Sequence, residues 1–203
     1  IGRKVGFVDY QNVAVGYARP ILARNLVTGG HVDDVDEEAR EIGAVNCVKI
    51  VDNKLIGYNT DVDGIRSSLD ALIGGACPVT LLLGTGGASQ AVQYVMAERG
   101  MEYAIVSRDP MRGNMTYEQI DDRVMSEVGL IINATPVGTF PNVDEAPEIP
   151  YHLLNESHSL FDLVYNPPVT RFLAWGANNG AQTMNGQMML ERQAERAWAI
   201  WNE

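Results

Sequence analysis

The stretch from Pro78 to Gly100 constrains the fold of this chain more than any other. Residues 79–83 form a short apolar run bounded by Pro78 and Gly84, which predicts a strand buried on both faces. After the glycines, apolar residues recur at helical spacing up to Gly100, which is placed to end the helix. Strand, tight turn and helix N-terminus together predict a phosphate-binding cradle, because free backbone N–H groups and the positive end of the helix dipole meet there.

The spacing of the small residues in this turn favours a dinucleotide. Gly84 permits the turn, Gly86 lets a pyrophosphate approach the backbone, and Ser89 is small enough for the helix to pack close to the strand. A second strand, predicted at 103–106, follows at the distance of a βαβ unit. A plain tight turn without a ligand is the alternative interpretation.

Length and composition limit the class of protein. The 203 residues, 46% hydrophobic and 20% charged, suit one globular domain, or one domain with a small appendage. The net charge of −11 argues against a nucleic-acid partner. No apolar run reaches the roughly 18–20 residues of a membrane span and no signal peptide is recognised, so we expect no membrane partner and a cytoplasmic location.

The cysteines and histidines suggest no catalytic or metal site. Cys47 and Cys77 lack metal-ligand spacing, and we expect both to be buried, reduced thiols. His31, His152 and His158 are scattered over predicted loops, where surface or capping roles are expected.

From residue 79 onward, predicted strands and helices alternate, which is typical of a doubly wound Rossmann-type parallel sheet. The strands are expected at 79–83, 103–106, 128–132 and 159–164, and the helices after the glycine turn, from about 115, near 151, from 171 and over about 187–201. The sequence before residue 79 predicts a reduced α/β appendage. We expect a strand at 4–8, a helix over about 13–26 and a helix capped by Asp33 or Asp34 that ends near 42. A hairpin over 43–58 and a helix from 62 to about 73 should follow.

The carboxyl ends of parallel strands share one sheet edge, where ligands bind in such folds. Four glycine-rich or polar motifs fall at these ends: Gly84–Gly87, Ser107–Arg108, Asn133–Thr135 and Tyr165–Asn166. The sequence therefore predicts one ligand site along this edge.

The second of these motifs favours NADP over NAD. Ser107 and Arg108 stand where an NAD site would carry an acidic residue for the ribose hydroxyl, and a guanidinium there suits a 2′-phosphate. Arg112 is close enough to assist, whereas Asp109 would favour NAD. The alternative is that Arg108 is only a solvated loop residue.

Two polar positions before residue 62 admit more than one role. Asp61 precedes an amphipathic helix, where a cap is the commoner function of such a residue. Asn46 is expected inside a strand, where a buried amide needs a partner, which is either a ligand or the backbone.

Six ordered motifs resemble those of the shikimate dehydrogenase family, in its short bacterial form. The resemblance covers roughly residues 33–203 and rests on Gly43-Ala-Val-Asn46, Gly57-Tyr-Asn-Thr-Asp61, Gly84-Thr-Gly-Gly-Ala88, Asn133-Ala-Thr-Pro136, Asp162-Leu-Val-Tyr-Asn-Pro167 and Asn185-Gly-Gln-Met-Met-Leu-Glu-Arg-Gln193. That family reversibly reduces 3-dehydroshikimate to shikimate with NADPH.

The resemblance implies roles for individual residues. On the substrate side, Asn46, Asp61 and Gln193 match residues that bind the substrate hydroxyls, Asp61 also matches the carboxylate of a catalytic Lys–Asp pair, and Tyr165 matches a substrate-side tyrosine. On the cofactor side, the matching positions are Gly84, Gly86, Gly87 and Ala88 in the loop, Ser107 and Arg108 at the 2′-phosphate, and Thr135 and Gly186 at the nicotinamide. The implied parts are a remnant of the substrate-binding domain over 1–60, an NADP-binding domain over 61–185 and a returning helix over 186–203.

The chain also departs from the family pattern. The serine pair expected after the first strand is absent from residues 9–15, and the strand that carries the catalytic lysine has no counterpart. A segment equivalent to roughly two βα units is missing between Arg24 and Asp33. Thr139 replaces a usual methionine and Gln187 a usual leucine.

We therefore expect NADP binding with poor turnover of shikimate, because Asp61 alone, with an ordinary pKa near 4, is a weak base at neutral pH. Loss of strands exposes sheet edges and apolar surface, which predicts a homo-oligomer. Two alternatives remain open. One is a non-catalytic NADP-binding or assembly module, and the other is a relative that oxidises another hydroxy acid such as quinate.

Overall fold

The computed structural model describes residues 32–203. The strand predicted at 4–8, the helix predicted over 13–26 and His31 lie outside the described residues. Within them, no helix is both long and apolar enough to cross a membrane.

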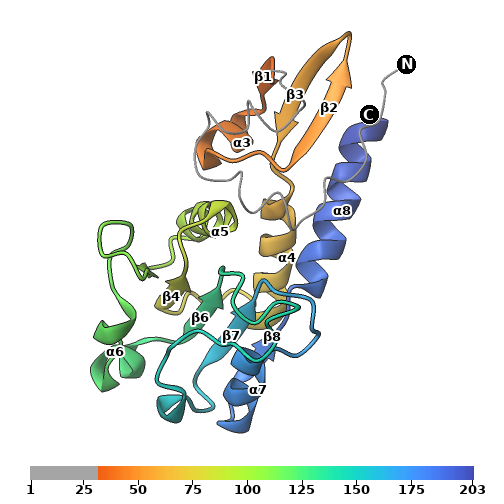
Figure 1. Cartoon of the computed structure of the whole chain (residues 1–203). Helices are drawn as coiled ribbons and strands as arrows, with labels where there is room; N and C mark the ends of the chain where they lie inside the picture. The colour runs from red at the N-terminus through yellow and green to blue at the C-terminus, as the bar shows by residue number, and fades with distance from the viewer. Residues whose placement is uncertain (1–31) are drawn as a thin grey trace.

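A five-stranded parallel sheet forms the larger part of the molecule (Figure 1). Its strands stand in the order β5-β4-β6-β7-β8 and comprise β4 (Thr80–Leu83), β5 (Tyr103–Val106), β6 (Leu130–Asn133), β7 (Ser159–Asp162) and β8 (Gln182–Met184). β5 pairs with one edge of β4 and β6 pairs with the other, so the strand order reverses between β4 and β6. The predicted doubly wound Rossmann-type sheet is confirmed.

Helices cover both faces of this sheet. On one face, Leu82, Ile132 and Phe161 pack against apolar side chains of α4 (Asp61–Ile73), α5 (Gly87–Glu98) and α8 (Gln187–Asn202). On the other, Leu81 and Leu83 join a second core with α6 (Asp122–Glu127) and α7 (Arg171–Asn178). Alternate residues of one strand therefore enter different cores, which is why the central strands read as unbroken apolar runs.

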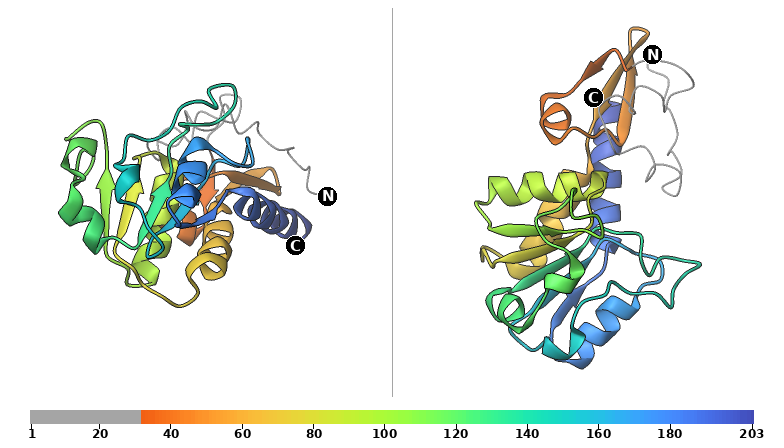
Figure 2. Two further views of the ribbon diagram at one scale, coloured as in Figure 1. Left: turned by 90° about the horizontal axis from the view of Figure 1, so that it is seen from below. Right: turned by 60° about the vertical axis from the view of Figure 1, so that its left-hand side comes forward.

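A small three-stranded sheet lies beyond the start of α4 and beside the C-terminal end of α8 (Figure 2). β1 (Asp34–Val35) runs parallel to β3 (Lys54–Tyr58), and β2 (Cys47–Val51) pairs antiparallel with β3. The turn between β2 and β3 has φ +47° at Asp52 and +66° at Asn53, as a two-residue type I′ hairpin requires. The predicted hairpin is therefore present, with α3 (Glu37–Ile42) beside it.

Helix α8 ties the two sheets together. It starts directly after β8 and runs to the small sheet, where the Trp201 indole N–H donates to the Val48 carbonyl at 3.0 Å. Cys47, Ala197 and Ile200 form a small core there with Tyr58. Burial raises the pKa of the Cys47 thiol to about 11, so this cysteine is an unreactive packing group at neutral pH.

Several sequence predictions of elements were wrong in detail. Strand β8 was not predicted, because it has only three residues and is partly polar. The cap of α3 is Asp36, whose carboxylate accepts from the Glu38 N–H, while Asp33 instead accepts from Leu55 of β3. The helix predicted from 115 is one 3-10 turn, η1 (Tyr117–Gln119), with a capping box at Thr116, and α6 follows as a separate helix.

Two predictions about reactive side chains also need correction. Cys77 is exposed, because it lies in the connection between α4 and β4 and not in a core. His158 is buried, with 2% of its surface exposed. Its Nε2 lies 3.1 Å from the Met125 carbonyl and its Nδ1 lies 3.2 Å from the Asn155 N–H, so the ring bridges β7 and α6.

Candidate active site

The glycine turn between β4 and α5 lies at the point where the strand order reverses. Gly84 has φ +106°, which a residue with a side chain rarely adopts. A Cβ at this position would also lie 2.8 Å from Cγ2 of Thr135 and 3.1 Å from the Ala134 carbonyl oxygen. Gly84 is thus required both by its conformation and by the close approach of the loop that follows β6.

The first turn of α5 is open to a ligand. Gly86 is exposed, and a Cβ there would meet no atom within 4 Å. No side chain caps the helix, and its first turn, which includes Gly87 and Ala88, contains no acidic residue. Ser89 is fully buried and its hydroxyl donates to the Gly84 carbonyl at 2.8 Å, so it holds the turn together. An anion would find free N–H groups and the positive end of the helix dipole here.

The loop after β5 presents two cations. Ser107 is buried and its hydroxyl accepts from the Asp109 N–H at 3.1 Å, while Arg108 and Arg112 are exposed. Neither arginine forms a salt bridge with another residue in the described part of the chain. The Asp109 carboxylate accepts from the Met111 N–H at 2.9 Å, so it serves the turn itself. Because the Asp109 carboxylate is bound within its own turn, its presence is weaker support for NAD than the sequence suggested.

A hydrogen-bonded chain joins the carboxyl ends of β6 and β7. The Asn133 carboxamide oxygen accepts from the Thr135 N–H at 3.1 Å and from the Thr135 hydroxyl at 2.6 Å. The Asn133 amide nitrogen donates to Oδ1 of Asp162 at 2.9 Å, and the Thr170 hydroxyl donates to Oδ2 at 2.5 Å. Burial raises the pKa of Asp162 to about 6, against the opposing effect of its hydrogen-bond donors, which include the Val164 N–H.

Three polar residues meet between the small sheet and α8. Asn46 lies just before β2, Thr60 just before α4, and Gln193 on α8. Oδ1 of Asn46 accepts from the Thr60 N–H at 2.8 Å and lies 3.2 Å from the Thr60 hydroxyl, which also lies 3.2 Å from Oε1 of Gln193. Since one hydroxyl hydrogen cannot serve both oxygens, the consistent arrangement gives the N–H to Asn46 and the hydroxyl hydrogen to Gln193.

One donor of this cluster is unused. The Asn46 side-chain nitrogen is buried and has no hydrogen-bond partner among the described residues. Leaving a buried N–H unpaired costs about 1–3 kcal/mol, so the position calls for an acceptor. An oxygen of a bound ligand would supply one.

Asp61 is buried at the start of α4, with 1% of its surface exposed. It is the first residue of the helix and not its cap, which is Thr60, and its N–H donates to Oδ1 of Asn59 at 3.0 Å. The predicted capping role of Asp61 is therefore wrong. Asp61 directly follows Thr60, the residue that contacts Asn46.

Tyr165 and Gly186 lie where β7 and α8 approach each other. The Gly186 N–H donates to the Val164 carbonyl at 3.1 Å, and a Cβ at Gly186 would lie 2.1 Å from the Leu163 carbonyl oxygen. This close approach explains the glycine without a ligand. The Tyr165 side chain is 36% exposed on the adjoining loop.

The described residues bring no lysine to this cluster. Lys54 is exposed at the hairpin turn and Lys49 lies on β2, while Lys4 is outside the described range. Within residues 32–203, no three His, Cys, Asp or Glu side chains are grouped as a metal site would require.

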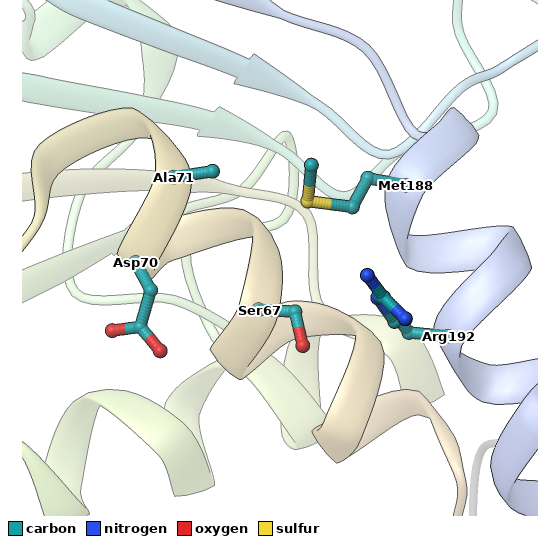
Figure 3. Close-up of a pocket in the computed structure, with 5 residues that line it drawn as sticks. All are labelled: Ser67, Asp70, Ala71, Met188 and Arg192. Carbon is teal, nitrogen blue, oxygen red and sulfur yellow. The ribbon is translucent and has the colours of Figure 1, made fainter.

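A separate hollow lies on the outer surface between α4 and α8 (Figure 3). It is lined by Ser67, Asp70, Ala71, Met188 and Arg192. Its polar groups already have partners: Asp70 pairs with Arg99 at 2.6 Å, Arg192 pairs with Glu195 at 2.7 Å, and the Ser67 hydroxyl donates to the Asp63 carbonyl. The hollow therefore lacks the free donors that the glycine turn and Asn46 offer.

Sequence reasoning missed the contribution of two residues. Thr60 stands between two quoted site residues, but only the structure shows that it contacts both Asn46 and Gln193. Asp162 belongs to a quoted motif but was given no role. Its partners lie 29 and 8 residues away, a separation that no local pattern reveals.

Comparison with known proteins decides the family. The shikimate dehydrogenase (NADP(+)) of Clostridium beijerinckii is 34% identical over 202 residues, which cover 95% of this chain and 71% of the relative. The chain belongs to the shikimate dehydrogenase family. The Methanococcus maripaludis enzyme of the same name is 35% identical over 84% of this chain and 66% of its own length. No protein-family model matches the chain.

Solved structures of shikimate dehydrogenases agree with the observed fold. One, in complex with NADP+, superposes with a TM-score of 0.74 at 29% identity and covers 96% of this chain and 77% of its own. The Thermus thermophilus enzyme, in complex with NADP(H) and shikimate, superposes with a TM-score of 0.73 at 35% identity over 84% of this chain and 67% of its own. The chain spans 77% and 67% of the length of these two structures.

Proposed function

We propose that this chain binds NADP and interconverts shikimate and 3-dehydroshikimate, as its family does, with low turnover. The proposal rests on one observation above all. The molecule carries two open binding features. One is the glycine turn at the carboxyl edge of the large sheet, and the other is the unpaired, buried Asn46 donor beside the start of α4.

The cofactor is proposed to lie across the carboxyl edge of the five-stranded sheet. Its pyrophosphate would meet the N-terminus of α5 at Gly86, Gly87 and Ala88, where no side chain occupies the space in front of Gly86. Its 2′-phosphate would be held by Ser107, Arg108 and Arg112. Thr135 and Gly186 would then border the nicotinamide end.

The substrate is proposed to be a small ring with several hydroxyl groups. The Asn46 side-chain nitrogen is the donor that the cluster leaves unused, while its Oδ1 is held by Thr60. Gln193 belongs to the same cluster through Thr60, and Asp61 and Tyr165 are proposed to contribute a carboxylate and a phenol to the same substrate. Amides, a carboxylate and a phenol together suit a polyol better than an apolar ligand.

Low turnover is expected because residues 32–203 bring no lysine to accept the proton of the reacting hydroxyl. NADP supplies the hydride acceptor when it is bound, and a proton must leave the hydroxyl in the same reaction. General acid–base assistance contributes roughly 10²–10⁴ in rate. Asp61 is the carboxylate nearest to this task, and Lys49 and Lys54 lie on the hairpin of the small sheet.

A second candidate is a non-catalytic NADP-binding module. The absence of a lysine from the cluster, within residues 32–203, favours it. The retained Asn46, Thr60 and Gln193 cluster favours the enzyme, since a module without a substrate has no use for an unpaired buried donor.

An assay of shikimate-dependent NADPH formation, combined with a binding titration of shikimate, separates these candidates. We expect saturable shikimate binding to the NADP-loaded chain and turnover about 100-fold or more below that of the Clostridium beijerinckii relative measured in parallel. Turnover equal to the relative contradicts the impairment. Absence of any shikimate binding favours the non-catalytic NADP-binding module. Preferential binding of quinate favours a relative that oxidises quinate.

A further inference from the structure

We propose that Asp162 is a positioning residue for the cofactor. It fixes Asn133, which fixes Thr135, which in turn shapes the glycine turn at Gly84. This inference rests on the proposed NADP site and adds to it a residue that the bound cofactor cannot touch, because Asp162 is completely buried.

The first step is the contact between Asp162 and Asn133. Oδ1 of Asp162 accepts from the Asn133 side-chain nitrogen at 2.9 Å and from the Val164 N–H at 3.1 Å. Oδ2 accepts from the Thr170 hydroxyl at 2.5 Å. The carboxylate therefore offers only acceptors, and this determines which end of the Asn133 amide faces it.

The second step follows from that orientation. With its nitrogen turned to Asp162, Asn133 presents its oxygen to the loop after β6, where the Thr135 N–H and hydroxyl both donate to it. An amide turned the other way would place two donors against the Thr135 N–H. The carboxylate at 2.9 Å, with the Val137 carbonyl at 3.4 Å from the same nitrogen, thus selects the amide orientation that holds Thr135 by two bonds.

The third step is the contact between Thr135 and the glycine turn. Cγ2 of Thr135 lies 2.8 Å from the place that a Cβ on Gly84 would occupy, so the methyl group lies directly against the turn. Movement of Thr135 would release Gly84 from this contact. The chain from Asp162 to Gly84 crosses from β7 through β6 to β4, over the point where the strand order reverses.

The Arg108 loop lies on the opposite side of β4. It follows β5, which pairs with β4 on the edge away from β6 and β7. The positioning chain should therefore affect the pyrophosphate and nicotinamide end of NADP and leave the adenosine 2′-phosphate end unaffected. This difference separates positioning from general loss of structure.

The test compares two ligands on folded variants, by fluorescence or calorimetric titration. Asp162→Asn is expected to weaken NADP binding roughly ten-fold, while adenosine 2′-monophosphate, which has no 5′-phosphate to reach the glycine turn, binds within two-fold of the wild type. Thr135→Val, at a half-buried loop position, is expected to show the same selective loss. Combining the two substitutions should weaken NADP no further than the stronger single one, because both act through the same contact.

Thr170→Val is the matched control. It removes the bond to Oδ2 and the cap of α7, but it leaves the bond between Oδ1 and Asn133 in place. We expect lower stability with NADP affinity within two-fold of the wild type.

Three results would overturn the inference. The first is unchanged NADP affinity in folded Asp162→Asn or Thr135→Val. The second is an equal loss of affinity for both ligands, which would indicate a general structural effect. The third is a wild-type chain that binds neither ligand, which would remove the proposed cofactor site itself.

Discussion

At the residue scale, the hydroxyl of Thr60 is the link on which the cluster of Asn46, Thr60 and Gln193 depends. Thr60→Val keeps the shape of the side chain but leaves the buried Oε1 of Gln193 without its donor. We expect the free energy of unfolding to fall by about 1–2 kcal/mol. Urea denaturation measures this, with Thr60→Ser as the control that keeps the hydroxyl. Equal stability of the valine and serine variants would contradict the assignment.

Asp162 gives the second residue-scale prediction, a pH dependence. Its pKa is raised from 3.8 to about 6 by burial, so the folded chain holds a proton that the unfolded chain releases between these values. Stability from this group is therefore lost as the pH rises through this window. Compared with Asp162→Asn, the wild type should lose about 2 kcal/mol of unfolding free energy between pH 4 and pH 7. An identical pH dependence in both proteins, measured by urea denaturation, would contradict the shift.

At the element scale, the glycine turn was predictable because the sequence signals that mark it are local, although the contact of Gly84 with Thr135 is not. Apolar runs, glycines and helical spacing identified β4, α5 and β5 from the sequence. Strand β8 was missed because Gln182–Met184 is held by pairing with β7 and carries no apolar run of its own. The capping residue of α3 was misplaced because β1 uses Asp34 and Val35, through pairing with a strand some twenty residues later.

The two ends of the turn give a matched pair of substitutions. Gly84→Ala should destabilise the fold by about 2 kcal/mol or more, because φ is positive and Thr135 leaves no room. Gly86→Ala meets no atom within 4 Å and should leave stability within about 0.5 kcal/mol of the wild type. It should nevertheless weaken NADP binding, since the methyl group would occupy the proposed pyrophosphate position. Unchanged NADP affinity in Gly86→Ala would argue against the cradle.

At the scale of the whole molecule, ion pairs join α3, beside the small sheet, to two helices that cover the large sheet. Arg66 of α4 bonds Glu38 of α3 at 2.7 Å and Glu98 of α5 at 2.8 Å. These partners are 28 and 32 residues away, so the sequence alone could not identify them. Together with α8, this junction sets the position of Asn46 relative to the glycine turn. The division into 1–60, 61–185 and 186–203 stays a prediction.

The small sheet also motivates the prediction of a homo-oligomer. Its described part has three strands, with β1 and β2 at its edges, and Trp198 on the adjacent α8 is 60% exposed. We expect light scattering at micromolar concentration to give a mass at least twice the 22.2 kDa of one chain. A monomer of 22.2 kDa would contradict this expectation.

The central claim about this molecule is that it binds NADP at the glycine turn between β4 and α5. A calorimetric titration of NADP and, separately, of NAD into the 203-residue chain tests this without requiring turnover. We predict one NADP site per chain and an affinity for NADP at least about ten-fold above that for NAD, because Arg108 and Arg112 face the proposed 2′-phosphate. No binding of NADP, or equal affinity for NAD, would contradict the account.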